Sequence, residues 1–160
     1  MEHTIKANHT ETPSIHKIGF LYGSITAIMM IVYFIIMWLL NLIEYAGFRY
    51  VNYLFIGLGI FLAYRSTLGK IHRLHLPYLQ GLLMGLWTYG FAAIVFGIFV
   101  GIFAAANSGF LPAIAPKIPI DGPLTPFMAG FLVFAESFII GVVWTLILMQ
   151  YFKREDEQEA

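Results

Sequence analysis

Apolar residues along this 160-residue chain are concentrated in four long runs, which are separated by short stretches where charged residues, proline and asparagine collect. The runs cover residues 18–40, 50–64, 77–106 and 126–152. The hydrocarbon core of a bilayer is about 30 Å thick and needs about 20 helical residues to cross it. The pattern therefore predicts four transmembrane helices.

Two of these runs depart from the ideal length in opposite directions. Run 50–64 is too short to cross by itself, so we expect it to borrow from its flanks, to let Arg49 and Arg65 extend toward the surfaces, or to sit where the bilayer is thin. Run 77–106 is longer than a bilayer requires, so we expect it to tilt, bend or project past one surface. Its first residue, Pro77, is suited to the first turn of a helix.

The segment between the third and fourth runs is rich in proline. Residues 107–126 contain five of the seven prolines in the chain. Because proline fixes one backbone angle and removes a hydrogen-bond donor, this spacing predicts an extended or turning backbone instead of a regular helix. The apolar residues of the segment place it against the bundle or the membrane surface.

Composition supports a membrane protein and excludes several other classes. Hydrophobic residues make up 59% of the chain and charged residues 11%, whereas soluble domains are about 25% charged. The formal net charge of zero argues against nucleic acid as a partner. Cysteine is absent, which excludes disulfides and thiolate chemistry. Residues 1–17 form a polar leader and residues 153–160 a charged tail, and we expect both in the cytoplasm.

The distribution of Lys and Arg predicts this orientation. Seven of the nine basic residues lie in the leader, in the segment between the second and third runs, and in the tail. Those three segments share one side of the membrane if all four runs span it. The positive-inside rule places that side in the cytoplasm.

Small residues in the third and fourth runs predict where helices pack, because close backbone contact favours association in lipid. On a helical wheel, one face of the third run carries Gly81, Gly85, Thr88 and Ala92. The roughly opposite face carries Gly90, Ala93, Gly97, Gly101 and Ala104. We therefore expect the third helix to contact two neighbours at the centre of the bundle. In the fourth run, Gly130, Ser137 and Gly141 form a similar stripe.

Glu136 is a carboxyl inside the fourth apolar run, next to Ser137. At 1.5 Å per residue it lies about 15 Å beyond Pro126, near the middle of the hydrocarbon. A charge at this depth costs on the order of 3 kcal/mol or more. No Lys, Arg or His lies within the four runs, so we expect an uncharged carboxyl that is hydrogen-bonded to a neutral donor. The candidate partners are Tyr33, Asn52, Tyr53, Thr88 and Tyr89.

Two kinds of role follow for this carboxyl. It can act as a hydrogen-bonded tie between helices or subunits, or as a functional group that relays a proton or cation or recognises a cationic partner. A relay normally uses a succession of ionisable groups, whereas the apolar runs supply one.

The remaining candidate chemistry is sparse. His72 and His75 are three residues apart and are weak candidates for a metal site, because no cysteine or nearby carboxylate accompanies them. The absence of histidine from the runs argues against a bis-histidine haem. Since nucleotide-binding, nucleophile and zinc-protease motifs are also missing, we predict neither a cofactor nor an enzymatic activity.

The order of features resembles domain-of-unknown-function family 4199, which comprises uncharacterised four-helix bacterial inner-membrane proteins. The likeness covers nearly the whole chain. It is carried by the segments IGFLYGSITAIMMIVYFII, YLFIGLGIFLAYRSTLGK, LPYLQGLLMGL and FIIGVVWTLILMQYFKRED. It implies a four-helix protein of a bacterial inner membrane and transfers no functional residues.

We therefore expect one all-α domain, a four-transmembrane-helix bundle with both termini in the cytoplasm. The leading functional hypothesis is a non-enzymatic accessory, assembly or structural component. It would pack through its glycine-rich helix faces within the lipid bilayer, as a homo-oligomer or in a larger membrane complex. The alternative is a small transporter or proton-conducting or cation-conducting unit that uses Glu136.

Overall fold

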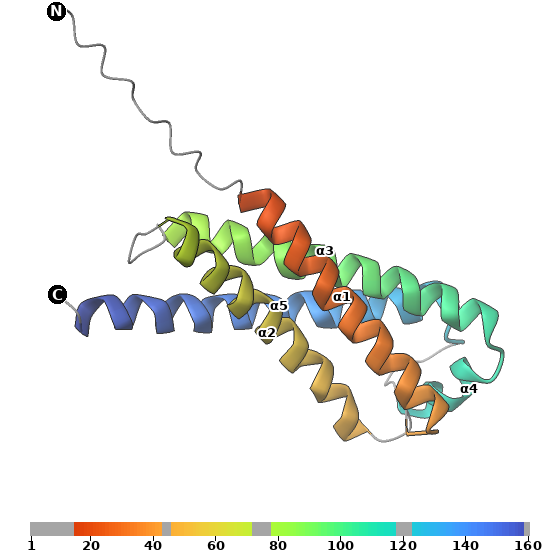
Figure 1. Cartoon of the computed structure of the whole chain (residues 1–160). Helices are drawn as coiled ribbons and strands as arrows, with labels where there is room; N and C mark the ends of the chain where they lie inside the picture. Colours follow the sequence, from red (N-terminus) through yellow and green to blue (C-terminus); the bar gives the residue numbers. More distant parts are fainter. Residues whose placement is uncertain (1–14, 43–45, 72–77, 118–122, 159–160) are drawn as a thin grey trace, which may run out of the picture.

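The computed structural model describes residues 15–42, 46–71, 78–117 and 123–158. All regular secondary structure within these ranges is helical (Figure 1). The elements are α1 (Ile15–Leu39), α2 (Ala46–Ile71), α3 (Tyr78–Ala106), α4 (Phe110–Ile114), the 3-10 helix η1 (Ala115–Lys117) and α5 (Pro126–Gln158).

Helices α1, α2, α3 and α5 form a bundle in which consecutive long helices alternate in direction (Figure 1). Short helix α4 lies at the end where α1 finishes and α5 starts, which we call the α4 end. The start of α1 and the finish of α5 lie at the opposite end. Each of the four long helices is long and apolar enough to cross a membrane. This confirms the predicted all-α fold with four candidate spans and fits a multi-pass membrane protein.

The helices follow the apolar runs, and α2 and α5 extend furthest beyond them. Helix α3 covers nearly all of the third run, and α5 begins at Pro126 as expected. Helix α2 takes in both flanks of the short second run, which gives it the length that the run lacked. Helix α5 continues through most of the charged tail. Hydropathy marks where the surroundings change, whereas a helix can continue into water.

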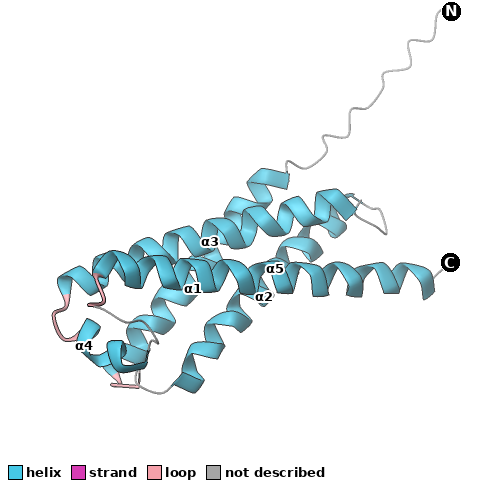
Figure 2. Cartoon of the chain, turned by 180° about the vertical axis from the view of Figure 1, so that it is seen from behind, coloured by secondary structure: helices cyan, strands magenta, loops and turns pink. Residues whose placement is uncertain are grey.

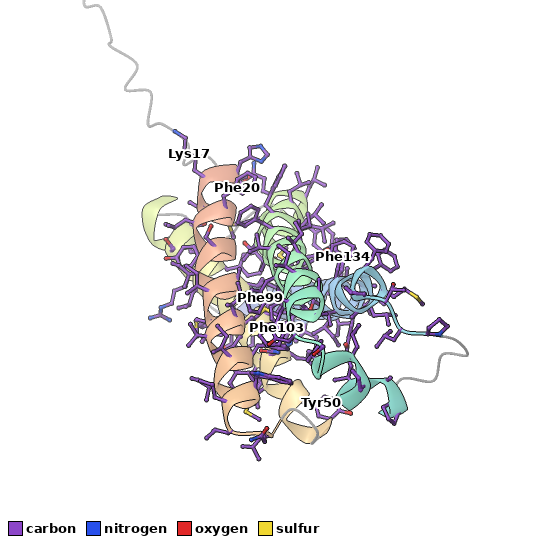
Figure 3. The ribbon with its side chains drawn as sticks, turned by 90° about the vertical axis from the view of Figure 1, so that its right-hand side faces the viewer. Lys17, Phe20, Tyr50, Phe99, Phe103 and Phe134 are labelled. Atoms are coloured by element: carbon purple, nitrogen blue, oxygen red, sulfur yellow. The ribbon has the colours of Figure 1, made fainter. Side chains whose placement is uncertain are left out.

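The proline-rich segment contains a helix that its prolines were expected to exclude. Pro112 lies in the first turn of α4, where backbone N–H groups have no partner within the helix, so its missing donor costs little. Phe110 anchors this turn, because its ring is buried. It packs edge-on against Phe34, Trp38 and Phe103 at centroid distances of 5.7, 5.8 and 5.5 Å. Figure 3 shows Phe103 and Phe99 between α1 and α3.

Helices α3 and α5 pack most extensively of all the pairs and run side by side (Figure 2). Small residues allow their close approach. A Cβ added at Gly85 would lie 2.6 Å from the side chain of Thr145, and one at Gly97 would lie 2.8 Å from Cβ of Phe134. At Gly130 it would meet the carbonyl oxygen of Gly97 at 2.6 Å. The backbones of α3 and α5 therefore nearly touch where these glycines meet.

Helix α3 contacts α1, α2 and α5, as its predicted central place implies, but its contacts with α5 follow a single oblique row that takes in glycines of both predicted faces. The row advances by four residues at each step and contains Gly81, Gly85, Tyr89, Ala93, Gly97 and Gly101. The α5 residues Met149, Thr145, Gly141, Phe134 and Pro126 are among its partners. Each step turns about 40° around the helix, so the two ends of the row fall on opposite sides of a wheel although α5 contacts both.

Gly90 stands outside this row. A Cβ at this position would meet no atom within 4 Å, so its predicted role in helix packing is wrong within the described part of the chain. The neighbour α1 instead approaches α3 through glycines of its own. A Cβ at Gly19 would lie 2.7 Å from Cβ of Trp87, and one at Gly23 would lie 2.7 Å from the carbonyl oxygen of Thr88.

The glycine contacts give a matched pair of variants. In Gly130→Ala the new methyl group meets the backbone of α3, which cannot move aside, and overpacking of this kind costs about 1–3 kcal/mol. In Gly90→Ala the methyl group enters open space, and the higher helix propensity of alanine leaves stability equal or slightly increased. Unfolding of both variants in the same detergent measures the difference. Equal stability would contradict the close α3–α5 contact.

Candidate functional site

Glu136 lies on α5 within the candidate span Pro126–Tyr151, nearer to the α4 end than to the opposite end. Its side chain is half-buried, whereas that of its neighbour Ser137 is buried. On a helical wheel, Glu136 is about 100° away from the face that packs on α3. Glu136 therefore lies to one side of the contact between α3 and α5.

The side chain of Glu136 is bonded to helix α2. The hydroxyl of Tyr53 donates a hydrogen bond to Oε1 of Glu136. Since Tyr53 is one of the five donors suggested by the sequence, the structure selects among candidates that the residue types alone left open. The bond connects two helices that are far apart along the chain.

The structure also shows contacts of three other suggested donors. The hydroxyl of Thr88 donates to the carbonyl oxygen of Met84 in its own helix. The ring of Tyr89 packs over Gly141, and the ring of Tyr33 meets that of Phe55 edge-on at 5.5 Å.

Asn52, the remaining candidate, lies one residue before Tyr53. Its Oδ1 atom is buried and has no hydrogen-bond partner. This oxygen is an acceptor, so it offers nothing to an ionised carboxylate.

The contact between Tyr53 and Glu136 belongs to a seam between α2 and α5. One turn further along α2, Gly57 lies against the indole ring of Trp144, and a Cβ at this position would be 2.7 Å from the ring. On the other side of Tyr53, the ring of Tyr50 packs edge-on at 5.6 Å. Tyr50 is 62% exposed and lies at the α4 end (Figure 3). The seam thus runs from that end of the bundle toward its middle.

A row of side chains runs along α5 from Glu136 toward the end opposite to α4. It contains Glu136, Ile140, Val143 and Ile147, which are spaced like one face of a helix. Val143 is 47% exposed and Ile147 is 50% exposed. We refer to this row together with Tyr50 and Tyr53 as the Glu136 face. It is an apolar strip with one carboxyl near one of its ends.

Two histidines were considered as metal ligands. His72 and His75 lie outside the described residues, and among the residues that are described no group of three His, Cys, Asp or Glu side chains could hold a metal ion. His16 is described and packs edge-on against Trp87 at 5.1 Å. Trp87 is 36% exposed and lies at the surface of the bundle.

Comparison with known proteins gives no match: no family model, no curated protein and no solved structure is similar to this chain. The resemblance to domain-of-unknown-function family 4199 thus stays a prediction.

The contact between Tyr53 and Glu136 is open to direct test. Hydrogen bonds between membrane helices contribute about 0.6–2 kcal/mol, so we expect Tyr53→Phe to lower the free energy of unfolding by about 1 kcal/mol. Tyr50→Phe is the matched control on the same helix and should change it by less than about 0.5 kcal/mol.

The same pair of variants in a Glu136→Ala background tests the cause of this loss. Without the carboxyl, Tyr53→Phe should no longer lower the free energy of unfolding, because the partner of the Tyr53 hydroxyl has already been removed. A loss of equal size in both backgrounds would mean that the Tyr53 hydroxyl stabilises the protein through some other group.

Proposed function

We propose that this chain is a non-enzymatic component of a bacterial inner membrane that acts by assembling with other membrane helices, as an oligomer or in a larger complex. The observation that carries the proposal is the placement of Glu136. Its carboxyl is held by Tyr53 at the border of the bundle, on a face otherwise made of apolar residues.

A carboxyl at this border favours association over isolation in lipid. Placing a polar group in the hydrocarbon costs free energy, and this cost falls when another helix covers the group and supplies a hydrogen-bond partner. The glycines that we expected to mediate assembly mostly contact α5 within the same chain. The proposal therefore rests on the Glu136 face and no longer on the glycine-rich faces of α3.

Conduction of protons or cations is the second candidate. The contact of Tyr50 with Tyr53, and of Tyr53 with Glu136, leads from the α4 end toward the carboxyl. Toward the opposite end, the row on α5 continues with Ile140, Val143 and Ile147, which cannot carry a proton further. This row favours assembly. Proton flux into proteoliposomes that disappears in Glu136→Gln would favour conduction instead.

The orientation of the chain is also part of the proposal. Lys17 and Arg65 are exposed at the end opposite to α4, where the sequence concentrates its basic residues. The positive-inside rule then places both termini in the cytoplasm and α4 on the outer side. The bacterial setting is supported by the resemblance of the span order to the family named above.

Because the chain lacks cysteine, single-cysteine variants can test this orientation cleanly. A membrane-impermeant maleimide should label Ser108→Cys, an exposed position next to α4, in intact cells. It should label His16→Cys only after the membrane is permeabilised. The reverse pattern would overturn the proposed orientation.

Assembly itself is tested by native mass spectrometry of the protein released from its own membranes in mild detergent. We expect the wild type to carry stoichiometric copies or partners, and Glu136→Gln to lose most of them because an amide presents different hydrogen-bond donors and acceptors to the partner. A wild type that is recovered as a lone monomer would count against assembly. Complexes retained in full by Glu136→Gln would mean that the Glu136 face is not the interface.

A further inference from the structure

We infer that the first half of α2, residues 46–55, is a gate at the α4 end that swings away from α5 about Gly57 and Gly59. The hydrogen bond from Tyr53 to Glu136 helps to hold it closed. The inference concerns the conformation of this chain and goes beyond the proposed assembly. Three features of α2 support it: the distribution of its buried residues, the place of its glycines and the surroundings of Asn52.

The first feature is a change in packing along α2. Seven of the residues from Ile56 to Thr67 are buried, whereas none of residues 50–55 is. In Figures 1 and 2 the start of α2 lies well away from α3 and α5. A segment with few buried contacts opens at a lower free energy than a packed one. Residues 46–55 are therefore the part of α2 that can move with the least loss of packing.

The second feature is the pair of glycines at which the packing changes. Gly57 lies against the indole ring of Trp144 on α5, and Gly59 lies against the side chain of Thr26 on α1. These contacts fix α2 between two neighbours. Because glycine adapts its backbone more easily than other residues, a movement of the first half pivots at this point.

The second half of α2 has a further attachment beyond this pivot. The buried Tyr64 donates a hydrogen bond from its hydroxyl to the carbonyl oxygen of Gly81 in α3 at 2.8 Å. The first half is held differently, through the ends of long side chains. Tyr53 reaches Glu136 across helices that diverge toward the α4 end, and Phe55 meets the ring of Tyr33 edge-on.

The third feature gives the gate a reason to open. Oδ1 of Asn52 is buried and has no hydrogen-bond partner in the described part of the chain. Asn52 lies one turn before the buried Ile56, on the face that α2 turns toward the bundle. A buried acceptor without a donor destabilises the closed state. When the gate swings out, this oxygen gains access to water at the α4 end, and the penalty is removed.

Hydrogen exchange of the wild-type protein in lipid nanodiscs tests the gate without any substitution. Residues 50–55 of α2 are compared with residues 130–135 of α5, which lie equally far from a helix start at the same end of the bundle. Simple fraying would affect both segments alike. Because α5 is packed on α3 in this region, we expect residues 50–55 to exchange about tenfold faster or more. Equal protection of the two segments would overturn the inference.

Two neighbouring substitutions should shift the gate in opposite directions. Tyr53→Phe removes the closing hydrogen bond, so exchange of residues 50–55 should rise about threefold or more. The matched control Tyr50→Phe should leave it unchanged. Asn52→Leu removes the buried acceptor at similar size, so exchange should fall about fivefold or more. An unchanged rate in Tyr53→Phe or in Asn52→Leu, or a shift in the opposite direction, would contradict the gate.

Spin labels show whether the movement is a swing of the first half alone. Because the chain contains no cysteine, Leu54→Cys in the gate and Leu62→Cys beyond the pivot can each be paired with Ile98→Cys on α3. In the Tyr53→Phe background we expect longer distances for the Leu54 pair and an unchanged distribution for the Leu62 pair. If both pairs lengthen, α2 leaves the bundle as a whole, and if neither does, the exchange reflects local unfolding. Either result would refute the gate.

Discussion

The close contact between α3 and α5 is the constraint on which the rest of the structure depends. In lipid, apolar surface does not drive helices together, so the energy of association comes from tight packing and from hydrogen bonds. The row on α3, whose members are spaced four residues apart, and the glycines of α5 provide that packing along most of the bundle. This pair forms a fixed frame, and α1 and α2 are placed against it.

The position of α2 then determines the chemistry of the border. Helix α2 meets α5 through Gly57 and Trp144, and this approach brings Tyr53 within hydrogen-bonding reach of Glu136. The carboxyl is oriented by a neutral donor between α2 and α5, on a residue that is half-buried. The glycine contacts thus act indirectly on function, because they decide where the single deep carboxyl lies.

The sequence predicted the parts of the structure that depend on local composition. Long apolar runs indicate helices reliably, and the depth of Glu136 followed from counting residues beyond Pro126. The short helix at Phe110 and the isolation of Gly90 were not foreseen, because each depends on contacts between segments distant along the chain. A helical wheel shows only the angle of each residue around the axis, so a row that runs obliquely along a helix cannot be recognised on it. The hydrogen bond from Tyr53 to Glu136 likewise depends on how α2 crosses α5, which the sequence does not show.

Photo-crosslinking in native membranes tests most directly whether the Glu136 face meets another protein. A benzophenone amino acid would be placed at Ile147 on this face and, separately, at Ile98 on α3, both of which are exposed. The account predicts a protein adduct from Ile147 that is lost when Glu136→Gln is added, and adducts with lipid alone from Ile98. Lipid adducts alone from both positions, or an Ile147 protein adduct that does not depend on Glu136, would contradict it.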